Sequence, residues 1–370
     1  MELHERLEPV NSLFRLPGPT PLPPRVLEAM QRPMIPHRGK EFRTFNSSLL
    51  ERLRAIHKTT GDVLVWPGSG SAGWEIAIVN LLSQGDPVLI AVTGDFGERF
   101  ARTAAVLGAD VRRIEIPWGE AVTVDDLRAA LKANPEVVAV LLTHNETSTG
   151  VTNPLAELAA VARAHGALVL VDAVSSAAGL PLETDAWGLD FVLSGSQKAW
   201  MCPPGLVIVT CSEKAWQAQA KSAYRSYFWN MKKARDAAAD GSTPTTPPLT
   251  LLYALDAAVA MIEEESIERV WERHARIGES TRSGIAALGL QLLPSEAYAS
   301  NTVTAFFPPD GLQARQIVDH LKQEHGVTVA AGQGHMADAI VRIGHMGWVD
   351  DEDVVVCVDA LRHTLEQLID

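Results

Sequence analysis

Short apolar stretches alternate with amphipathic ones through the middle of the chain, between roughly residues 60 and 210. The apolar stretches are short and rich in β-branched residues, so they predict strands, whereas the segments between them have helical spacing. Repeated strand and helix units predict an α/β fold with a mostly parallel, doubly wound sheet, which binds ligands beyond the carboxyl ends of its strands. The predicted strands are Asp62–Trp66, Val88–Val92, Val111–Ile116, Val137–Leu142, Leu168–Val171, Phe191–Leu193 and Leu206–Val209, and the predicted helices are Ala72–Leu82, Phe96–Leu107, Val124–Ala133 and Pro154–His165.

The pattern changes after a loop rich in Pro and Gly at Asp240–Pro248. A helical tract follows through Ala287, bent or interrupted somewhere along its length. Shorter strands and helices come next and end in an amphipathic helix over Asp350–Leu368. We therefore divide the chain into an N-terminal segment 1–20, a large domain 21–250 and a smaller C-terminal α+β domain 251–370.

Two of the predicted strands end abruptly in ionisable residues. Asp172 closes the run that begins at Ala167, and Lys198 closes the run that begins at Phe191. An acid and a lysine at adjacent strand ends suit pyridoxal phosphate (PLP), because the lysine forms a Schiff base and the carboxylate keeps the pyridine nitrogen protonated. A plain salt bridge is the alternative explanation of this pair.

Composition and charge narrow the class of protein. The 370 residues are 46% hydrophobic and 21% charged, as in an ordinary globular enzyme, and the formal charge of -13 argues against nucleic acid or an anionic membrane as a partner. The three cysteines have neither disulfide-framework nor zinc-site spacing, which fits a reducing compartment. We find no export signal and no apolar run long enough to span a membrane, and we expect a cytoplasmic protein.

A glycine- and serine-rich turn, Trp66–Glu75, follows the first predicted strand and opens a helix. Its glycines allow close backbone approach, and the amino end of the helix offers free N–H groups to a phosphate. The same letters spell the dinucleotide fingerprint G-x-G-x-x-G, which also expects an acidic residue at the end of the next strand. Val88–Thr93 ends without one, so the nicotinamide interpretation is disfavoured, and a helix start without a ligand is the plainer alternative.

With these pieces placed, the chain resembles the class V, fold-type I PLP aminotransferases, and most of all the alanine/serine-glyoxylate and serine-pyruvate group. The motifs that carry the resemblance occur in the family's order: Leu16–Thr20, Thr143–Gly150, Val171–Ser176, Ser194–Trp200 and Val341–His345. The resemblance implies that the large domain binds PLP, that segment 1–20 lines the active site, and that Gly18 contacts the substrate.

The resemblance also implies roles for the residues that would contact the cofactor. Lys198 becomes the Schiff-base lysine and proton shuttle, which requires its pKa to be lowered, and Asp172 pairs with the pyridinium nitrogen. Thr243 stands where some relatives have a tyrosine. The remaining implied contacts are Ser69, Gly70, Ser71 and Gln197 to the phosphate, Thr147 to the ring hydroxyl, and Thr246 to the phosphate from the other subunit of a homodimer.

Phe96 and Arg342 complete the implied site. Phe96 lies where relatives stack an aromatic ring on the pyridine, and its alternative is a core phenylalanine. Arg342 interrupts the apolar strand Ile340–Ile343, and its planar guanidinium matches the substrate α-carboxylate. The alternative for Arg342 is an internal ion pair with an acid.

Other reactive residue types have plainer explanations. Cys202 and Cys357 invite a desulfurase interpretation, but small core residues are the better one. His144, His335 and His345 lack metal-ligand spacing, and we predict no metal.

The sequence thus predicts a homodimeric PLP transaminase that moves the amino group of alanine or serine to glyoxylate or pyruvate by a ping-pong mechanism. Aspartate, phosphoserine, an aminophosphonate or pyridoxamine as donor stay open on the same scaffold, as does a PLP lyase. A nicotinamide-binding or non-catalytic protein with a doubly wound sheet is the alternative from another class.

Overall fold

A seven-stranded sheet forms the centre of the molecule in this computed structural model, which describes residues 13–369. The strand order is β2-β10-β9-β8-β5-β3-β4, and all neighbours are parallel except that β10 runs antiparallel to both β2 and β9. The predicted mostly parallel sheet is therefore confirmed. Its strands are β2 (Asp62–Gly68), β3 (Pro87–Val92), β4 (Asp110–Glu115), β5 (Ala139–Thr143), β8 (Leu168–Asp172), β9 (Phe191–Gly195) and β10 (Gly205–Cys211).

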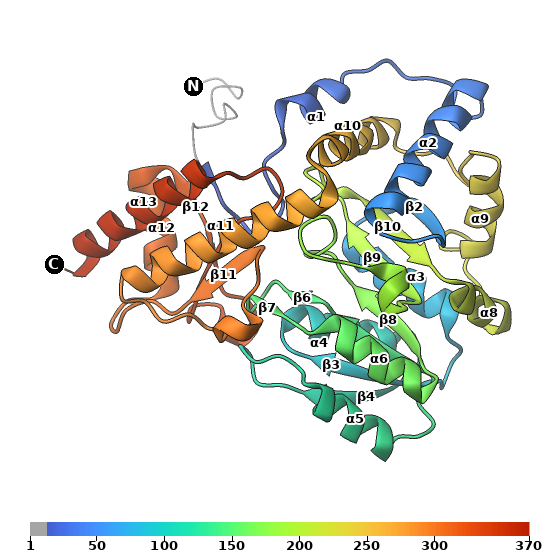
Figure 1. The fold of residues 1–370 in the computed structure, drawn as a ribbon, viewed down its shortest axis with the longest axis horizontal. Helices are drawn as coiled ribbons and strands as arrows, with labels where there is room; N and C mark the ends of the chain where they lie inside the picture. Colours follow the sequence, from blue (N-terminus) through green and yellow to red (C-terminus); the bar gives the residue numbers. More distant parts are fainter. Residues whose placement is uncertain (1–12, 370) are drawn as a thin grey trace.

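Helices cover both faces of this sheet (Figure 1). Side chains along a strand point alternately to the two faces of the sheet. A strand whose residues are all apolar is therefore buried on both faces. In β3, Val88 and Ile90 pack into one hydrophobic cluster, and Leu89 and Ala91 into the other. The first cluster includes α3 (Gly70–Leu81), α4 (Asp95–Val106), α8 (Glu213–Lys221) and α9 (Met231–Ala239), and the second includes α1 (Pro24–Ala29), α2 (Lys40–Ile56), α5 (Val124–Ala133), α6 (Leu155–His165) and α10 (Leu249–Glu265).

The second domain is a small antiparallel sheet with helices on it, as expected for an α+β unit. Its strand order is β11-β14-β13, and the long helix α11 runs into it from the large domain (Figure 1). Its elements are α11 (Ile267–Ala287), β11 (Val303–Phe306), α12 (Ala314–His325), β12 (Val327–Thr328), β13 (Ala330–Ala331), β14 (Val341–Gly344) and α13 (Asp351–Ile369).

Packing divides the chain later than residue 250. Buried residues of α10, including Leu252 and Leu255, and the first buried residues of α11 belong to the large-domain core, because that face of α10 is apolar along its whole length. The expected interruption of the helical tract lies at Ser266, whose positive φ of 70° separates α10 from α11.

The chain before α1 joins the two domains. Within the predicted segment 1–20, residues 1–12 lie outside the described residues. Strand β1 (Leu13–Phe14) pairs in parallel with β12, and the carbonyl of Arg15 accepts the N–H of Gly344 in β14. The segment then continues to the large domain, where Thr20 is hydrogen-bonded to the backbone of Gln197 and Lys198. It therefore passes between the small sheet and the carboxyl edge of the large one.

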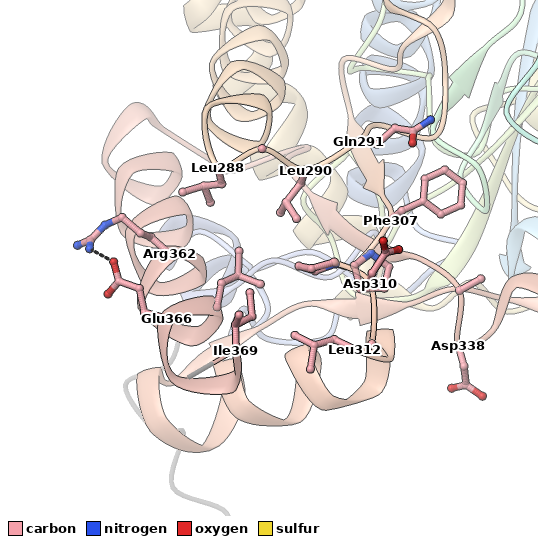
Figure 2. Close-up of a pocket in the computed structure, with 16 residues that line it drawn as sticks. Leu288, Leu290, Gln291, Phe307, Asp310, Leu312, Asp338, Arg362, Glu366 and Ile369 are labelled. Carbon is pink, nitrogen blue, oxygen red and sulfur yellow. Dashed lines mark hydrogen bonds and ion pairs between the residues drawn. The ribbon is translucent and has the colours of Figure 1, made fainter.

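An open groove of about 1050 Å³ lies on the small domain, between the end of α11, the loop before α12 and helix α13. Leucine side chains and Ile369 line it, with the Arg362–Glu366 ion pair at one side (Figure 2). None of the predicted site residues borders this groove.

Candidate active site

Asp172 and Lys198 lie at the same carboxyl edge of the large sheet, and their described hydrogen-bond partners are other residues. Asp172 is the last residue of β8, and Lys198 follows the end of the parallel neighbour β9. Because parallel neighbours end at the same edge, the two functional groups that are distant in sequence are brought to one place.

Asp172 is 3% exposed, and its two oxygens have separate donors. The indole Nε1 of Trp74 donates to Oδ2 and the backbone N–H of Val174 donates to Oδ1, both at 2.8 Å. Burial raises the pKa of Asp172 to about 6, while these two hydrogen bonds and the charge of Lys198 act in the opposite direction. The carboxylate is thus fixed in orientation, and a protonated ring nitrogen beside it would favour the charged form.

Lys198 is 7% exposed, and its amine donates to the carbonyl of Pro17. Burial lowers the pKa of this amine to about 8; the charge of Arg342 acts in the same direction, whereas Asp172 and Glu146 oppose it. The neutral amine that attacks a carbonyl is therefore accessible near physiological pH.

The amino end of α3 forms a cradle for an anion. Its N-cap, Ser69, makes no side-chain capping bond, and the hydroxyls of Ser69 and Ser71 stand at exposed positions. Gln197 lies alongside: a Cβ built on Gly195 would be 2.9 Å from Gln197 Oε1 and 3.5 Å from the backbone nitrogen of Gly70. Gln197 Oε1 is buried with no hydrogen-bond partner among the described residues. The free N–H groups of this helix end and the hydroxyls of Ser69 and Ser71 can donate to a phosphate, and the Gln197 amide would donate through Nε2.

Phe96, at the start of α4, is half-buried rather than enclosed in the core. The centroid of its ring lies 5.9 Å from the amine of Lys198 and 5.3 Å from the guanidinium carbon of Arg99. The ring therefore borders the site, as stacking on a cofactor requires, and is not simply a packing residue.

Thr147 follows β6 (Asn145–Glu146) and is buried. Its hydroxyl donates to Ser175 Oγ at 2.7 Å, and that hydroxyl in turn donates to the carbonyl of Asn145 at 2.9 Å. The chain of hydrogen bonds joins the loop after β5 to the loop after Asp172 and so holds Thr147 at the sheet edge where Asp172 lies.

Arg342, on β14 of the small domain, is 5% exposed and reaches the segment that carries Thr147. Its guanidinium donates to the carbonyl of Ala331 at 2.8 and 3.0 Å, to the carbonyl of Thr147 at 3.1 Å and to Gln333 Oε1 at 3.2 Å. No carboxylate lies within 4.0 Å of it in the described part of the chain, so the internal ion pair is not the explanation of its burial. Burial lowers its pKa to about 10, and Glu146 and Asp95 raise it.

Gly18 touches Lys198 directly. Its φ is +108°, and a Cβ there would lie 2.6 to 2.7 Å from the Cδ, Cε and Nζ atoms of Lys198. Thr20 donates from its hydroxyl to the Lys198 carbonyl at 3.0 Å. The described part of the N-terminal segment therefore forms one wall around the lysine.

Three further residues of the site were not predicted. Trp74 and Val174 hold Asp172, and Glu146 accepts hydrogen bonds from the amino end of α4. Only Glu146 carried a signal, an acid within an otherwise uncharged stretch at a strand end; the other two contacts arise from tertiary packing.

Thr246 is not joined to the other predicted residues within one chain. It is exposed in the loop after α9, where the Thr243 hydroxyl donates to the Thr245 carbonyl at 2.8 Å. An exposed position is what a contact with a second subunit would need.

Cys202, Cys357 and His345 lie in structural environments. Cys202 and Cys357 are buried, and burial raises the pKa of both thiols, that of Cys357 to about 12, which disfavours the nucleophilic thiolate. His345 Nε2 is bonded to Thr304 Oγ1 at 2.8 Å. Within residues 13–369, no His, Cys, Asp and Glu cluster could hold a metal ion, and no helix has the length and apolarity to cross a bilayer.

A Gly18→Ala substitution tests the wall around the lysine. We expect it to displace Lys198, because the new methyl group overlaps its side chain and the positive φ costs about 1–2 kcal/mol in any L-residue. The yield of PLP fixed to the protein by borohydride should fall severalfold. Gly311→Ala is the matched control, since it has φ +89° and nothing within 4 Å of its Cβ; equal yields for both variants would contradict the contact.

Known proteins resemble this chain along nearly its whole length. The model of the aminotransferase class-V family matches residues 13–354. A soluble hydrogenase small subunit of Synechococcus sp. is 38% identical over 361 residues, covering 97% of this chain and 94% of that protein. The serine–glyoxylate aminotransferase of Methylorubrum extorquens is 39% identical over 350 residues, covering 91% and 86%.

Among solved structures, the alanine–glyoxylate aminotransferase of Nostoc sp. superimposes with a TM-score of 0.92 at 32% identity, covering 99% of both chains. The match in sequence and fold and the cradle that fits PLP lead to one conclusion. The chain belongs to the class V aminotransferases and is a PLP-dependent transaminase of fold type I.

Proposed function

We propose that this enzyme moves the amino group of alanine or serine to glyoxylate or pyruvate by a ping-pong mechanism. The observation that carries the proposal is that buried Lys198 and Asp172 lie at the sheet edge reached by the buried Arg342 guanidinium, which has no described acid partner. Serine–glyoxylate and alanine–glyoxylate aminotransferases are among the proteins that this chain resembles.

In this proposal PLP supplies an aldehyde and an electron-accepting ring, and the protein's own groups bind, orient and move protons. Asp172 keeps the ring nitrogen protonated, Lys198 moves the proton at the substrate Cα, and Phe96 stacks on the ring. Arg342 binds the α-carboxylate through the Nη2–H that its four described hydrogen bonds leave free, while Gly18 leaves room at the substrate side. Ser69, Gly70, Ser71 and Gln197 bind the phosphate, and Thr147 bonds the ring hydroxyl.

The preference for a small amino acid follows from the surroundings of Arg342, the proposed clamp for the substrate α-carboxylate. Gln333 bonds Arg342, and the next two residues pack on Trp118: a Cβ on Gly334 would lie 3.1 Å from the indole, and the His335 ring centroid is 4.0 Å away. Aromatic rings this close to the carboxylate site restrict the space left for a substrate side chain.

We also propose that the enzyme works as a homodimer in the cytoplasm. Thr246 is exposed, and the predicted phosphate contact from the other subunit would complete the cradle. The buried, unpaired cysteines suit a reducing compartment. The net negative charge of the chain disfavours nucleic acid and anionic membranes as partners.

Lys198→Ala combined with a donor panel tests the function. The wild-type enzyme should turn over serine or alanine with glyoxylate or pyruvate, and the variant should lose about a thousandfold or more, since its proton-transfer group is gone. Coupled assays against glyoxylate, pyruvate and 2-oxoglutarate give the rates, with aspartate, phosphoserine, an aminophosphonate and pyridoxamine as competing donors. A preference for 2-oxoglutarate, or undiminished turnover by the variant, would contradict the proposal.

Arg342→Gln tests the clamp. Losing a charge-assisted hydrogen-bonded pair is worth about 1.5–3 kcal/mol, so the KM for the amino acid should rise roughly tenfold to a hundredfold. Steady-state kinetics with serine or alanine measure the change. Arg282→Gln removes another buried guanidinium, bonded to the Ser300 carbonyl at 2.9 Å outside the proposed site. A KM that rises equally in both variants would show that the effect is structural.

The dimer is tested by mixing subunits. Lys198→Ala and Thr246→Ala chains, co-expressed with different tags, form mixed dimers in which one of the two sites has both native residues. If each site is shared between protomers, a mixed dimer has one native site and should show about half of the wild-type turnover per dimer. Dimers of Thr246→Ala chains alone should stay below that level. A monomer in sedimentation experiments, or no recovery in the mixed dimers, would refute the shared site.

A further inference from the structure

Glu146 is fully buried, with 0% of its surface exposed, and the function proposed above gives it no role. Four donors surround its carboxylate. The backbone N–H groups of Phe96, Gly97 and Ser148 donate to it at 3.3, 3.0 and 3.1 Å, and the Ser148 hydroxyl donates as well.

Two of these donors belong to the first turn of α4, which lacks a cap of its own. A helix leaves its first N–H groups without partners, and a side chain at the N-cap normally accepts from one of them. The N-cap here is Gly94, which has none. Glu146 accepts from Phe96 and Gly97, and Ser148 Oγ accepts from the N–H of Asp95 at 2.9 Å.

The geometry leaves no space for a local cap. A Cβ on Gly94 would lie 2.4 Å from both Glu146 Cγ and Ser148 Oγ. The cap of α4 is therefore supplied by a segment about fifty residues further along the chain, and glycine at position 94 is what lets that segment approach.

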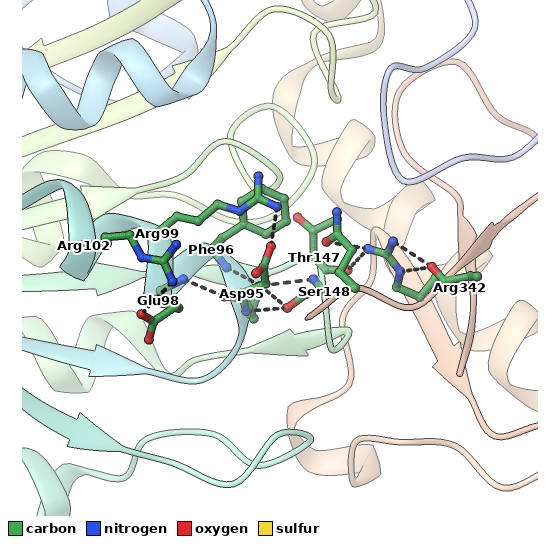
Figure 3. A network of polar contacts seen from close by, with 12 residues as sticks. Asp95, Phe96, Glu98, Arg99, Arg102, Thr147, Ser148 and Arg342 are labelled. Atoms are coloured by element: carbon green, nitrogen blue, oxygen red, sulfur yellow. Dashed lines mark hydrogen bonds and ion pairs between the residues drawn. The ribbon is translucent and has the colours of Figure 1, made fainter. Parts of the chain in front are cut away.

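The same three-residue segment reaches the other parts of the site. Phe96, whose backbone Glu146 holds, places its ring centroid 5.9 Å from the Lys198 amine. Thr147, the next residue, accepts from Arg342 through its carbonyl. Figure 3 shows this line of contacts from Asp95 and Phe96 through Thr147 and Ser148 to Arg342.

Glu146 also acts on the charges around it. All four described partners are donors, and the positive end of the α4 dipole lies against the carboxylate, so the ionised form fits this environment although burial raises the pKa of the group. Its charge raises the pKa of Lys198 and Arg342 and that of Asp172. From α4, Asp95 faces the same region and is paired with Arg99, Oδ2 to Nη2 at 2.7 Å.

We propose that Glu146 is a positioning residue: it caps α4 from a distant strand, thereby fixes Phe96 against the cofactor ring, and holds a negative charge at the same edge of the sheet as Lys198. The inference rests on the proposed function, because it concerns how this chain presents Phe96 and Lys198 to PLP.

Glu146→Gln tests the charge with little change in shape. The visible absorbance of PLP bound to the purified protein is titrated with pH, and its midpoint reports proton loss at the Lys198 nitrogen. Removing a neighbouring negative charge disfavours the protonated cation, so the midpoint should move down by about one pH unit. A midpoint equal to that of the wild-type protein overturns the inference.

Asp190→Asn is the matched control. Asp190 is also a buried acid that accepts a backbone N–H, from Val169 at 2.9 Å, but it precedes β9 and lies at the opposite edge of the sheet. We expect this variant to lower the melting temperature without moving the midpoint. A midpoint that falls equally in both variants would assign the effect to general destabilisation.

Ser148→Ala keeps the charge and removes one anchor of α4, and it decides the case if Glu146→Gln does not fold. Equilibrium binding of PLP to the apoprotein should weaken severalfold while the midpoint stays in place, and unchanged PLP binding overturns the capping role. The two hypotheses fail differently: a wild-type protein without any visible PLP band refutes the proposed function, whereas a normal wild-type titration with indifferent variants refutes only the role of Glu146.

Discussion

Two buried cations and two buried anions, held together at one edge of a sheet, are the constraint on which the rest of the structure depends. Lys198, Arg342, Asp172 and Glu146 are each at most 7% exposed. Removing one such charge from water is expensive unless hydrogen bonds and opposite charges compensate it. Here each charge shifts the pKa of others in the group, so none of the four can be understood alone.

The topology explains why these charges can meet. Parallel strands β8 and β9 place Asp172 and Lys198 at one edge of the sheet. Strand β10, the other neighbour of β9, runs antiparallel and therefore ends at the opposite edge. Arg342 arrives from a different domain. The N-terminal segment, bonded to β12 and β14 on one side and to Lys198 on the other, therefore connects the domains exactly where the charges lie.

Much of this could be predicted from the sequence, because it depends on local periodicity. The helix predicted at Val124–Ala133 has exactly those bounds, since a capping box at Thr123 fixes its start. The carboxyl ends of β8 and β9 could be predicted because Asp172 and Lys198, which are ionisable, follow apolar runs. For α3 and α4 the predicted starts were one or two residues late: neither helix begins with a side-chain cap, so the sequence carries no local signal there.

What the sequence could not give depends on contacts between distant segments. In the sequence, Trp74 looks like an ordinary core residue. Its role in holding Asp172 is apparent only from the hydrogen bond that its indole nitrogen donates to that carboxylate. The apolar helix α10 follows a loop that resembles a domain boundary, yet it packs into the large-domain core. Hydrophobic patterning predicts that a helix face is buried, but it does not predict which other element that face packs against.

The way Arg342 is held bears on selectivity. Backbone carbonyls and one amide orient its guanidinium but supply only partial charges, so a large part of the cost of burying this cation remains without compensation in the described chain. A substrate α-carboxylate would supply that compensation, and every amino acid and 2-oxo acid carries one. Binding energy from the clamp is thus the same for all of them, and discrimination must come from the space beside it, where Trp118 and His335 pack together. In hydrophobic pockets a single methylene changes affinity by only about 1–3 kcal/mol, so a site of this design separates small from large side chains more sharply than alanine from serine.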